Sequence, residues 1–136
     1  MNIVVKLAQA RLPVTIFNVE GDVDGSNFKE LIAKAQEAID GGARALLLDL
    51  TQVKYMSSAG LLALQTINAM LRGESTPDPE AGWQALHKME AASQTAKSSN
   101  LRLLNLQPRV DRALEMVGFK QFIQVYTDRD AALASF

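Results

Sequence analysis

The sequence contains no cysteine and only one histidine, His87. Without cysteine the chain forms no disulfide, binds no metal through thiolates and has no cysteine nucleophile. A zinc site needs several cysteine or histidine ligands, so we interpret His87 as a surface residue and expect neither a metal site nor a cofactor. The sequence also lacks a phosphate-binding glycine loop and the Gly-x-Ser-x-Gly elbow of hydrolases. We therefore predict that the protein is not an enzyme.

The sequence also lacks an excess of charge of either sign. Fourteen lysines and arginines face 15 acidic residues, which leaves a formal net charge of −1. A protein with so small a net charge has no overall positive electrostatic field to attract nucleic acid or anionic lipid, so we expect neither as a partner. The apolar runs are far shorter than the roughly 20 residues that cross a bilayer, and the N-terminus lacks the features of a signal peptide. These absences predict a cytoplasmic protein without membrane insertion.

Strand-like and helix-like patterns alternate along the chain. Residues 45–48 (Ala-Leu-Leu-Leu) follow a helix-stopping Gly41-Gly42 pair, which is typical of a strand covered on both faces. Alternation of this kind predicts an α/β fold: one domain spanning residues 1–136, with a mixed, mostly parallel sheet of four or five strands, helices packed on it and an N-terminal antiparallel hairpin. The expected strands are 3–8, 14–19, 43–50, 101–106 and 122–126, and the expected helices are 28–39, 58–71, 108–117 and a short one after Asp128.

Residues 73–99 interrupt this alternation. A turn-rich stretch ends in Asp78 and Pro79, a good start for a helix that would run to about Ala96. We interpret 73–99 as a helical or loop insertion between the second helix and the fourth strand. Its apolar stripe (Trp83, Leu86 and Met89) is consistent equally with packing on the domain and with binding a partner.

Two adjacent serines, Ser57 and Ser58, stand where the third strand gives way to the second helix. A helix N-terminus attracts anions, so a hydroxyl there either caps the helix or carries a phosphate. From position alone the capping role is the simpler interpretation. A cation held by Asp22, Asp24 and Asp49 is a weaker alternative because no known motif supports it.

Three segments, in order, resemble the signature of the STAS domain family. Residues 48–61 resemble its strand ending in Asp-Leu, followed by a loop and Ser-Ser-Ala-Gly-Leu. Residues 21–24 (Gly-Asp-Val-Asp) resemble the family's acidic loop after the second strand. Residues 108–119 resemble its third helix, which runs from Pro-x-Val to a Gly-Phe ending. Together the three segments cover nearly the whole chain apart from residues 73–99.

The resemblance implies a small bacterial regulator that binds an anti-sigma factor, which is also a serine kinase, and so frees a sigma factor. In the family the kinase phosphorylates one serine at this helix start and thereby abolishes binding; the matching residue here is Ser58, with Ser57 as the alternate. Ser57 stands where many members have aspartate, a departure that bears on kinase recognition. The implied partner contacts are Asp24, Ser57, Ser58, Ala59 and Leu62.

A second function stays open at this stage. Domains of this family also serve as non-phosphorylated adaptors in lipid-transport ABC complexes or in signalling assemblies. The serine in place of aspartate at position 57 and the insertion at 73–99 are compatible with that role. The oligomeric state, a homodimer included, is equally open.

Overall fold

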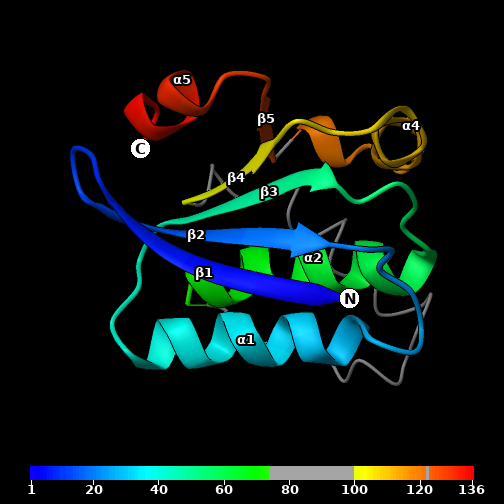
Figure 1. Ribbon diagram of the computed structural model, residues 1–136, viewed down its shortest axis with the longest axis horizontal. Coiled ribbons are helices and arrows are strands. Elements are labelled where there is room, and N and C mark those ends of the chain that lie inside the picture. The colour runs from blue at the N-terminus through cyan, green and yellow to red at the C-terminus, as the bar shows by residue number, and fades with distance from the viewer. Residues whose placement is uncertain (74–99, 122) are drawn as a thin grey trace.

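The structure is a computed structural model that describes residues 1–73, 100–121 and 123–136. The described residues form a five-stranded sheet whose strands lie side by side in chain order, β1-β2-β3-β4-β5 (Figure 1). The first two strands form an antiparallel hairpin paired over all eight residues, and β3, β4 and β5 add in parallel. The predicted α/β class and the predicted hairpin are therefore confirmed. The strands are β1 (Asn2–Gln9), β2 (Pro13–Glu20), β3 (Leu46–Gln52), β4 (Leu101–Leu104) and β5 (Gln124–Tyr126).

The helices begin close to the positions that the sequence predicts. Gly42 adopts φ 110°, a left-handed value that favours glycine, two residues after α1 ends. The side chain of Asp128 accepts a hydrogen bond from the Ala131 N–H at 3.1 Å and so caps the last helix, as predicted. The helices are α1 (Phe28–Asp40), α2 (Ser58–Leu71), α4 (Pro108–Met116), the 3₁₀ turn η2 (Phe119–Gln121) and α5 (Arg129–Ala134).

One predicted strand begins later than expected, and one predicted helix lies outside the described residues. The last strand begins at Gln124 rather than at 122, because the chain first forms η2 and closes it with a bond from the Ile123 N–H to the Phe119 carbonyl at 2.9 Å. The predicted helix from Pro79 to Ala96, with its stripe of Trp83, Leu86 and Met89, lies outside the described residues, as does His87.

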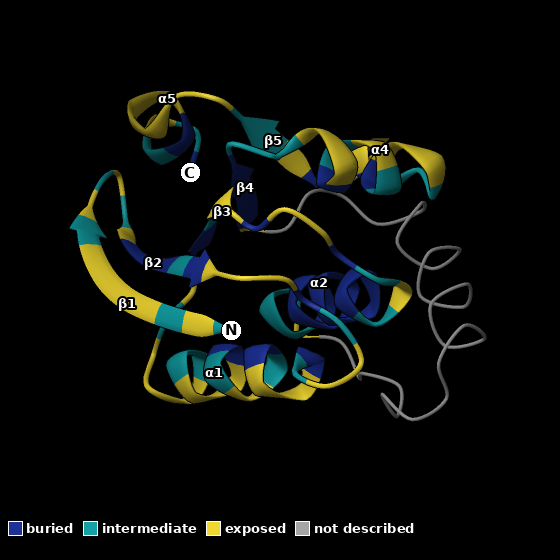
Figure 2. Ribbon diagram, turned by 45° about the vertical axis from the view of Figure 1, so that its right-hand side comes forward, coloured by how far each residue is buried: buried dark blue, intermediate teal, exposed yellow. Residues whose placement is uncertain are grey.

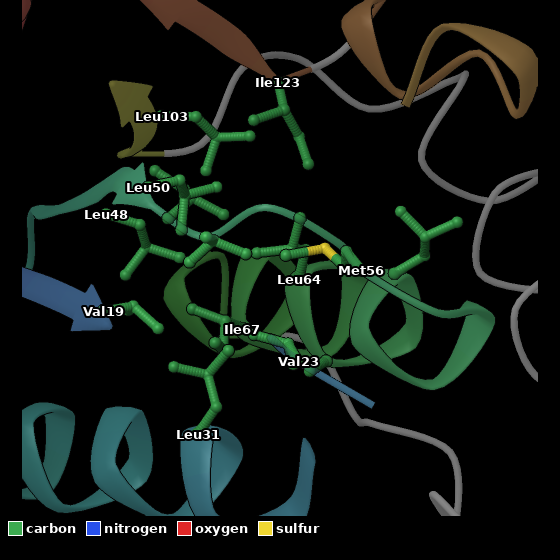
Figure 3. Close-up of a cluster of buried hydrophobic side chains, with 14 of the residues drawn as sticks. Val19, Val23, Leu31, Leu48, Leu50, Met56, Leu64, Ile67, Leu103 and Ile123 are labelled. Carbon is green, nitrogen blue, oxygen red and sulfur yellow. The ribbon is translucent and has the colours of Figure 1, made fainter. Parts of the chain in front are cut away.

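The central parallel strands, β3 and β4, are buried on both faces. Side chains alternate along a strand, so Leu46, Leu48 and Leu50 of β3 face one side, where α1, α2 and α4 pack (Figure 3). Leu47 faces the other side, in a smaller cluster with Ile16 and with Ala132 and Phe136 of the C-terminal segment. The prediction of a strand covered on both faces is confirmed, and β1 is the exposed edge of the sheet (Figure 2).

Helix α2 is the most deeply buried helix of the described residues. All ten residues from Gly60 to Ala69 are buried, including polar Thr66, whose hydroxyl donates to the Leu62 carbonyl at 2.8 Å (Figure 2). A helix that is buried all round occupies the inside of a fold rather than its surface. Only its start, at Ser58, reaches solvent before the buried stretch begins.

One buried cation ties β4 to the C-terminal segment. Arg102 is 5% exposed, and its guanidinium donates to the Ser135 hydroxyl at 3.0 Å, the Ser135 carbonyl at 3.3 Å and the Leu101 carbonyl at 3.2 Å. The same group lies 4.8 Å from the centre of the Phe136 ring. Burial lowers the pKa of the Arg102 guanidinium, which nevertheless stays charged because an arginine pKa begins so high.

We predict that Arg102→Ala destabilises the protein by about 2–3 kcal/mol, since carbonyls bonded to a charged donor would be left unpaired. Urea unfolding followed by circular dichroism measures this loss. Arg44→Ala is a matched control: Arg44 also donates to two carbonyls, those of Ile39 and Ala43, but it is exposed, and its removal should cost less than about 0.5 kcal/mol. Equal losses for the two variants would contradict the assigned role.

Candidate functional site

The N-termini of α1, α2 and α4 lie at one end of the molecule, the right-hand side of Figure 1. This follows from the topology, because β2, β3 and β4 run parallel and each is followed by a loop that leads into a helix. The carboxyl ends of parallel strands are where such folds place their binding residues. We call this surface the carboxyl edge; it comprises residues 21–27, 53–59 and 105–109.

Hydrogen bonds between main chains join the first two loops of the carboxyl edge. The Gly21 N–H donates to the Gln52 carbonyl at 3.0 Å, and the Val23 N–H donates to the Tyr55 carbonyl at 3.1 Å. The Ser57 N–H then donates back to the Val23 carbonyl at 2.9 Å. These bonds continue the parallel pairing of β2 and β3 past the ends of both strands, with a bridge between Val23 and Met56. They place the main chain at the junction of Val23 and Asp24 beside that of Ser57.

Glycine at position 60 permits this close approach. A Cβ on Gly60 would clash with the Met56 Cγ and would lie 3.1 Å from the Val23 carbonyl oxygen, tighter than most real side-chain contacts. Met56 and Val23 are themselves buried, and Figure 3 shows both beside α2. The first turn of α2 therefore packs directly on the loop that carries Asp24.

The two serines differ in their surroundings. Ser57 is the N-cap residue of α2, but its side chain makes no capping bond, and within the described residues its Oγ is buried without a hydrogen-bond partner. Ser58 is the first residue of the helix and is exposed. The capping interpretation, which the sequence left open between the two serines, is therefore wrong for the Ser57 side chain, and the exposed serine at this helix start is Ser58.

Asp24 lies in the loop of the carboxyl edge that connects β2 to α1. Its Oδ1 accepts from the Ser26 hydroxyl at 2.6 Å and from the Ser26 N–H at 2.9 Å, and these bonds lower the pKa of the Asp24 carboxyl. Asn27 Oδ1 accepts from the Asp24 N–H at 2.9 Å, while Asn27 Nδ2 donates to the Asp22 carbonyl. The loop is thus braced from within, and Asp24 is an oriented anion rather than a mobile one.

The two remaining predicted contacts, Ala59 and Leu62, differ in how deeply they are buried. Ala59 is half-buried beside Ser58. Leu62 is 2% exposed and belongs to the hydrophobic core. The predicted partner contact at Leu62 is therefore not supported by its position, because a core side chain offers a partner no surface. Leu62 instead anchors the start of α2.

Helix α4 also contributes to this edge, which the sequence pattern did not indicate. The Gln107 side chain donates to the Thr51 carbonyl at 2.6 Å, and the guanidinium of Arg109 lies 5.2 Å from the centre of the Tyr55 ring. The only features of the sequence that could have indicated this contact are an arginine beside a helix-opening proline and an aromatic residue in a loop. Nothing in their spacing of more than 50 residues indicated that they meet.

The third predicted acid, Asp49, bonds within its own strand. Its Oδ1 accepts from the Thr51 hydroxyl at 2.5 Å and the Thr51 N–H at 3.0 Å. In residues 1–73, 100–121 and 123–136, no three acidic, histidine or cysteine side chains are grouped in a way that could hold a metal ion. No helix within those residues has the length and apolar character needed to cross a bilayer.

The sequence and the fold are similar to those of known proteins, and these similarities identify the family of the chain. The STAS domain family model matches residues 6–75, about half of the chain, so the protein belongs to the STAS domain family. A putative anti-sigma factor antagonist of Bordetella bronchiseptica, BtrV, is 28% identical over 118 residues, which cover 87% of this chain and 82% of that protein.

Solved structures show the same fold. A putative anti-sigma factor antagonist from Thermotoga maritima is similar with a TM-score of 0.72 and 13% identity, over 98% of this chain and 92% of that one. The anti-sigma factor antagonist SpoIIAA of Bacillus has been solved in unphosphorylated and phosphorylated forms. These match with TM-scores of 0.55 and 0.54, at 12% and 14% identity, over 96% of this chain and over 92% and 96% of SpoIIAA.

We predict that Gly60→Ala destabilises the protein by about 1–2 kcal/mol through overpacking. Alanine normally favours a helix over glycine by up to about 1 kcal/mol, but here the added methyl group meets both a side chain and a main-chain oxygen. Gly25→Ala is the control: nothing lies within 4 Å of a Cβ there, so a change within about 0.5 kcal/mol is expected. Urea unfolding distinguishes the two; a stabilised Gly60→Ala protein would refute the close approach.

We also predict that Ser57→Ala leaves stability unchanged or increases it. Burying an unpaired hydroxyl costs about 1–3 kcal/mol, and alanine removes that cost, whereas loss of a true N-cap would destabilise the helix by about 1 kcal/mol. Thermal and urea unfolding measure the sign of the change. The control is Asp128→Ala, which removes a side-chain cap that is present and should destabilise.

Proposed function

We propose that the protein is an anti-sigma factor antagonist, a cytoplasmic regulator that uses the carboxyl edge to bind an anti-sigma factor that is also a serine kinase. Membership of the STAS family and the likeness to BtrV support this proposal. The contacts we assign to the partner are Asp24, Ser57, Ser58 and Ala59. Residues 1–136 act as a single domain, with 73–99 as its insertion.

We further propose that phosphorylation of Ser58 controls binding. The observation that carries this assignment is the contrast between the serines: the Ser57 oxygen is enclosed, while Ser58 is exposed at the first position of α2. A kinase must bring the hydroxyl oxygen in line with the γ-phosphate of ATP, which an enclosed oxygen does not allow. Ser58 is therefore the acceptor rather than Ser57.

The electrostatics of the carboxyl edge suit a switch of this kind. A phosphate on Ser58 would add about −1.5 to −2 charges. The free N–H groups at the start of α2 would favour it, whereas Asp24, held next to the serine pair, would oppose it. A partner that covers this surface would have to desolvate the dianion beside a second anion. About 2.7 kcal/mol is enough for a hundredfold loss of affinity, so the switch needs no change of conformation.

Intact-protein mass spectrometry tests the proposal, after incubation of the protein with ATP and a lysate of its source bacterium. We expect one phosphate on the wild-type protein and on Ser57→Ala, and none on Ser58→Ala. A serine-kinase substrate already known in that lysate serves as the positive control.

Three results would contradict the proposal. If neither the wild type nor Ser57→Ala gains a phosphate while the control substrate does, the adaptor function is favoured. If the phosphate persists in Ser58→Ala, the acceptor is wrongly assigned. A Ser58→Asp protein that binds its partner as tightly as the wild type would likewise exclude Ser58 as the switch.

A further inference from the structure

Large apolar side chains are exposed at two places in the described residues. Three of them, Val4, Val5 and Leu7, lie on the edge strand β1. The other two lie on α4 and on the loop that α4 contacts: Tyr55, 40% exposed, whose ring lies beside Arg109 of α4, and Met116, 80% exposed, at the end of α4. Tyr55 stands three residues before Ser58, within the surface that we assign to the partner.

Arg109 of α4 contacts Tyr55, and Met116 ends the same helix. Its guanidinium lies 5.2 Å from the centre of the Tyr55 ring, a cation–π arrangement that leaves the exposed arginine oriented. Arg109, Arg112 and Met116 follow one another at spacings of three and four residues, so they share one face of α4. Val110 and Leu114 are buried on the opposite face. We call Tyr55, Arg109, Arg112 and Met116 the α4 strip.

The charges of this end of the molecule are divided between its two sides. The loop between β2 and α1 carries Asp22 and Asp24. The opposite side carries Lys54, Arg109 and Arg112, all exposed. Of the two acids of α4, Asp111 is paired with Lys120 and Glu115 is exposed. Ser58 begins α2, which follows β3, and β3 lies between β2 and β4 in the sheet. The nearly neutral chain therefore has a local polarity here that its net charge of −1 conceals.

We propose that the docking surface for the anti-sigma factor kinase extends from Ser58 along the α4 strip, and that the strip receives an acidic segment of the partner with an apolar side chain set between its carboxylates. This inference rests on the proposed function. Charge complementarity selects the chemistry: carboxylates pair with Arg109 and Arg112, while a basic group of the partner faces Asp24. The apolar side chain covers Tyr55 and Met116.

The composition of the strip suits a high-energy contact. Tyrosine and arginine are enriched among the residues that contribute most to the binding energy of protein interfaces. Tyrosine buries a large area with only two side-chain torsions, and arginine pairs with carboxylates through a planar fork of donors. Tyr55 is already held by Arg109, so less side-chain freedom is lost when a partner binds. The strip is thus the part of the surface that determines how tightly the kinase holds its substrate, while Ser58 is the part that is modified.

The test is the initial rate of Ser58 phosphorylation by the same lysate and ATP, measured at low protein concentration by intact-mass analysis. We expect Tyr55→Ala and Arg109→Glu each to lower the rate at least tenfold, and Met116→Ser to lower it severalfold. At high protein concentration the rates should approach that of the wild type, because the strip affects binding rather than phosphoryl transfer. The effect of Arg109→Glu should shrink as salt is raised.

Leu7→Ser and Arg129→Glu are the matched controls. They change an exposed apolar residue on β1 and an exposed arginine on α5, and both should keep the wild-type rate within about twofold, on the scale of surface changes that cost no more than about 0.5 kcal/mol. If the strip variants unfold at the same temperature as the wild-type protein, loss of the fold is excluded as the cause of a lower rate.

The outcomes separate the two proposals. If the wild type is phosphorylated and the strip variants react at the same rate, the strip is wrong and the proposed function stands. If the controls slow as much as the strip variants, or if the strip variants slow equally at high protein concentration, the strip is likewise wrong. If the wild type takes up no phosphate while the known substrate does, both proposals fail together.

Discussion

The architecture of the site depends on the contact between the first turn of α2 and the loop that follows β2. The bonds from Val23 to Tyr55 and from Ser57 to Val23 require the two loops to run side by side, and Gly60 leaves the space that this needs. Helix α2 is buried almost from its start, so it cannot tilt away to relieve a clash. The spatial relation of Asp24 to the serine pair is therefore a property of the core and not of flexible loops.

This arrangement explains how the described sheet presents a specific surface at one end. Parallel strands deliver the N-termini of three helices to one end, and each contributes something different there. The start of α1 follows an anion braced by Ser26 and Asn27, α2 begins with an exposed hydroxyl, and α4 adds a cation stacked on Tyr55. Specificity in protein recognition comes largely from such fixed patterns of charge and shape.

Much of the fold could be predicted from local pattern. The apolar run after Gly41-Gly42 marks a strand, and Asp128 marks a helix start, because both signals depend on neighbours in the chain. Motif matching located Ser58 and Asp24. It could not separate the hydroxyls of Ser57 and Ser58, because which of two adjacent side chains is enclosed depends on what packs against them. For the same reason Leu62 was predicted to contact a partner, although its side chain lies in the core.

By itself the sequence determined the class of fold, the order of its elements, the near-neutral charge and the identity of the residues at the start of α2. These properties follow from composition and from periodicities of a few residues. Only the tertiary structure decided that Ser57 is enclosed, that Gly60 is needed for close packing, and that Arg109 meets Tyr55 across more than 50 residues of chain. Such contacts arise from the pairing of distant strands and the packing of helices on them, and local sequence does not encode them.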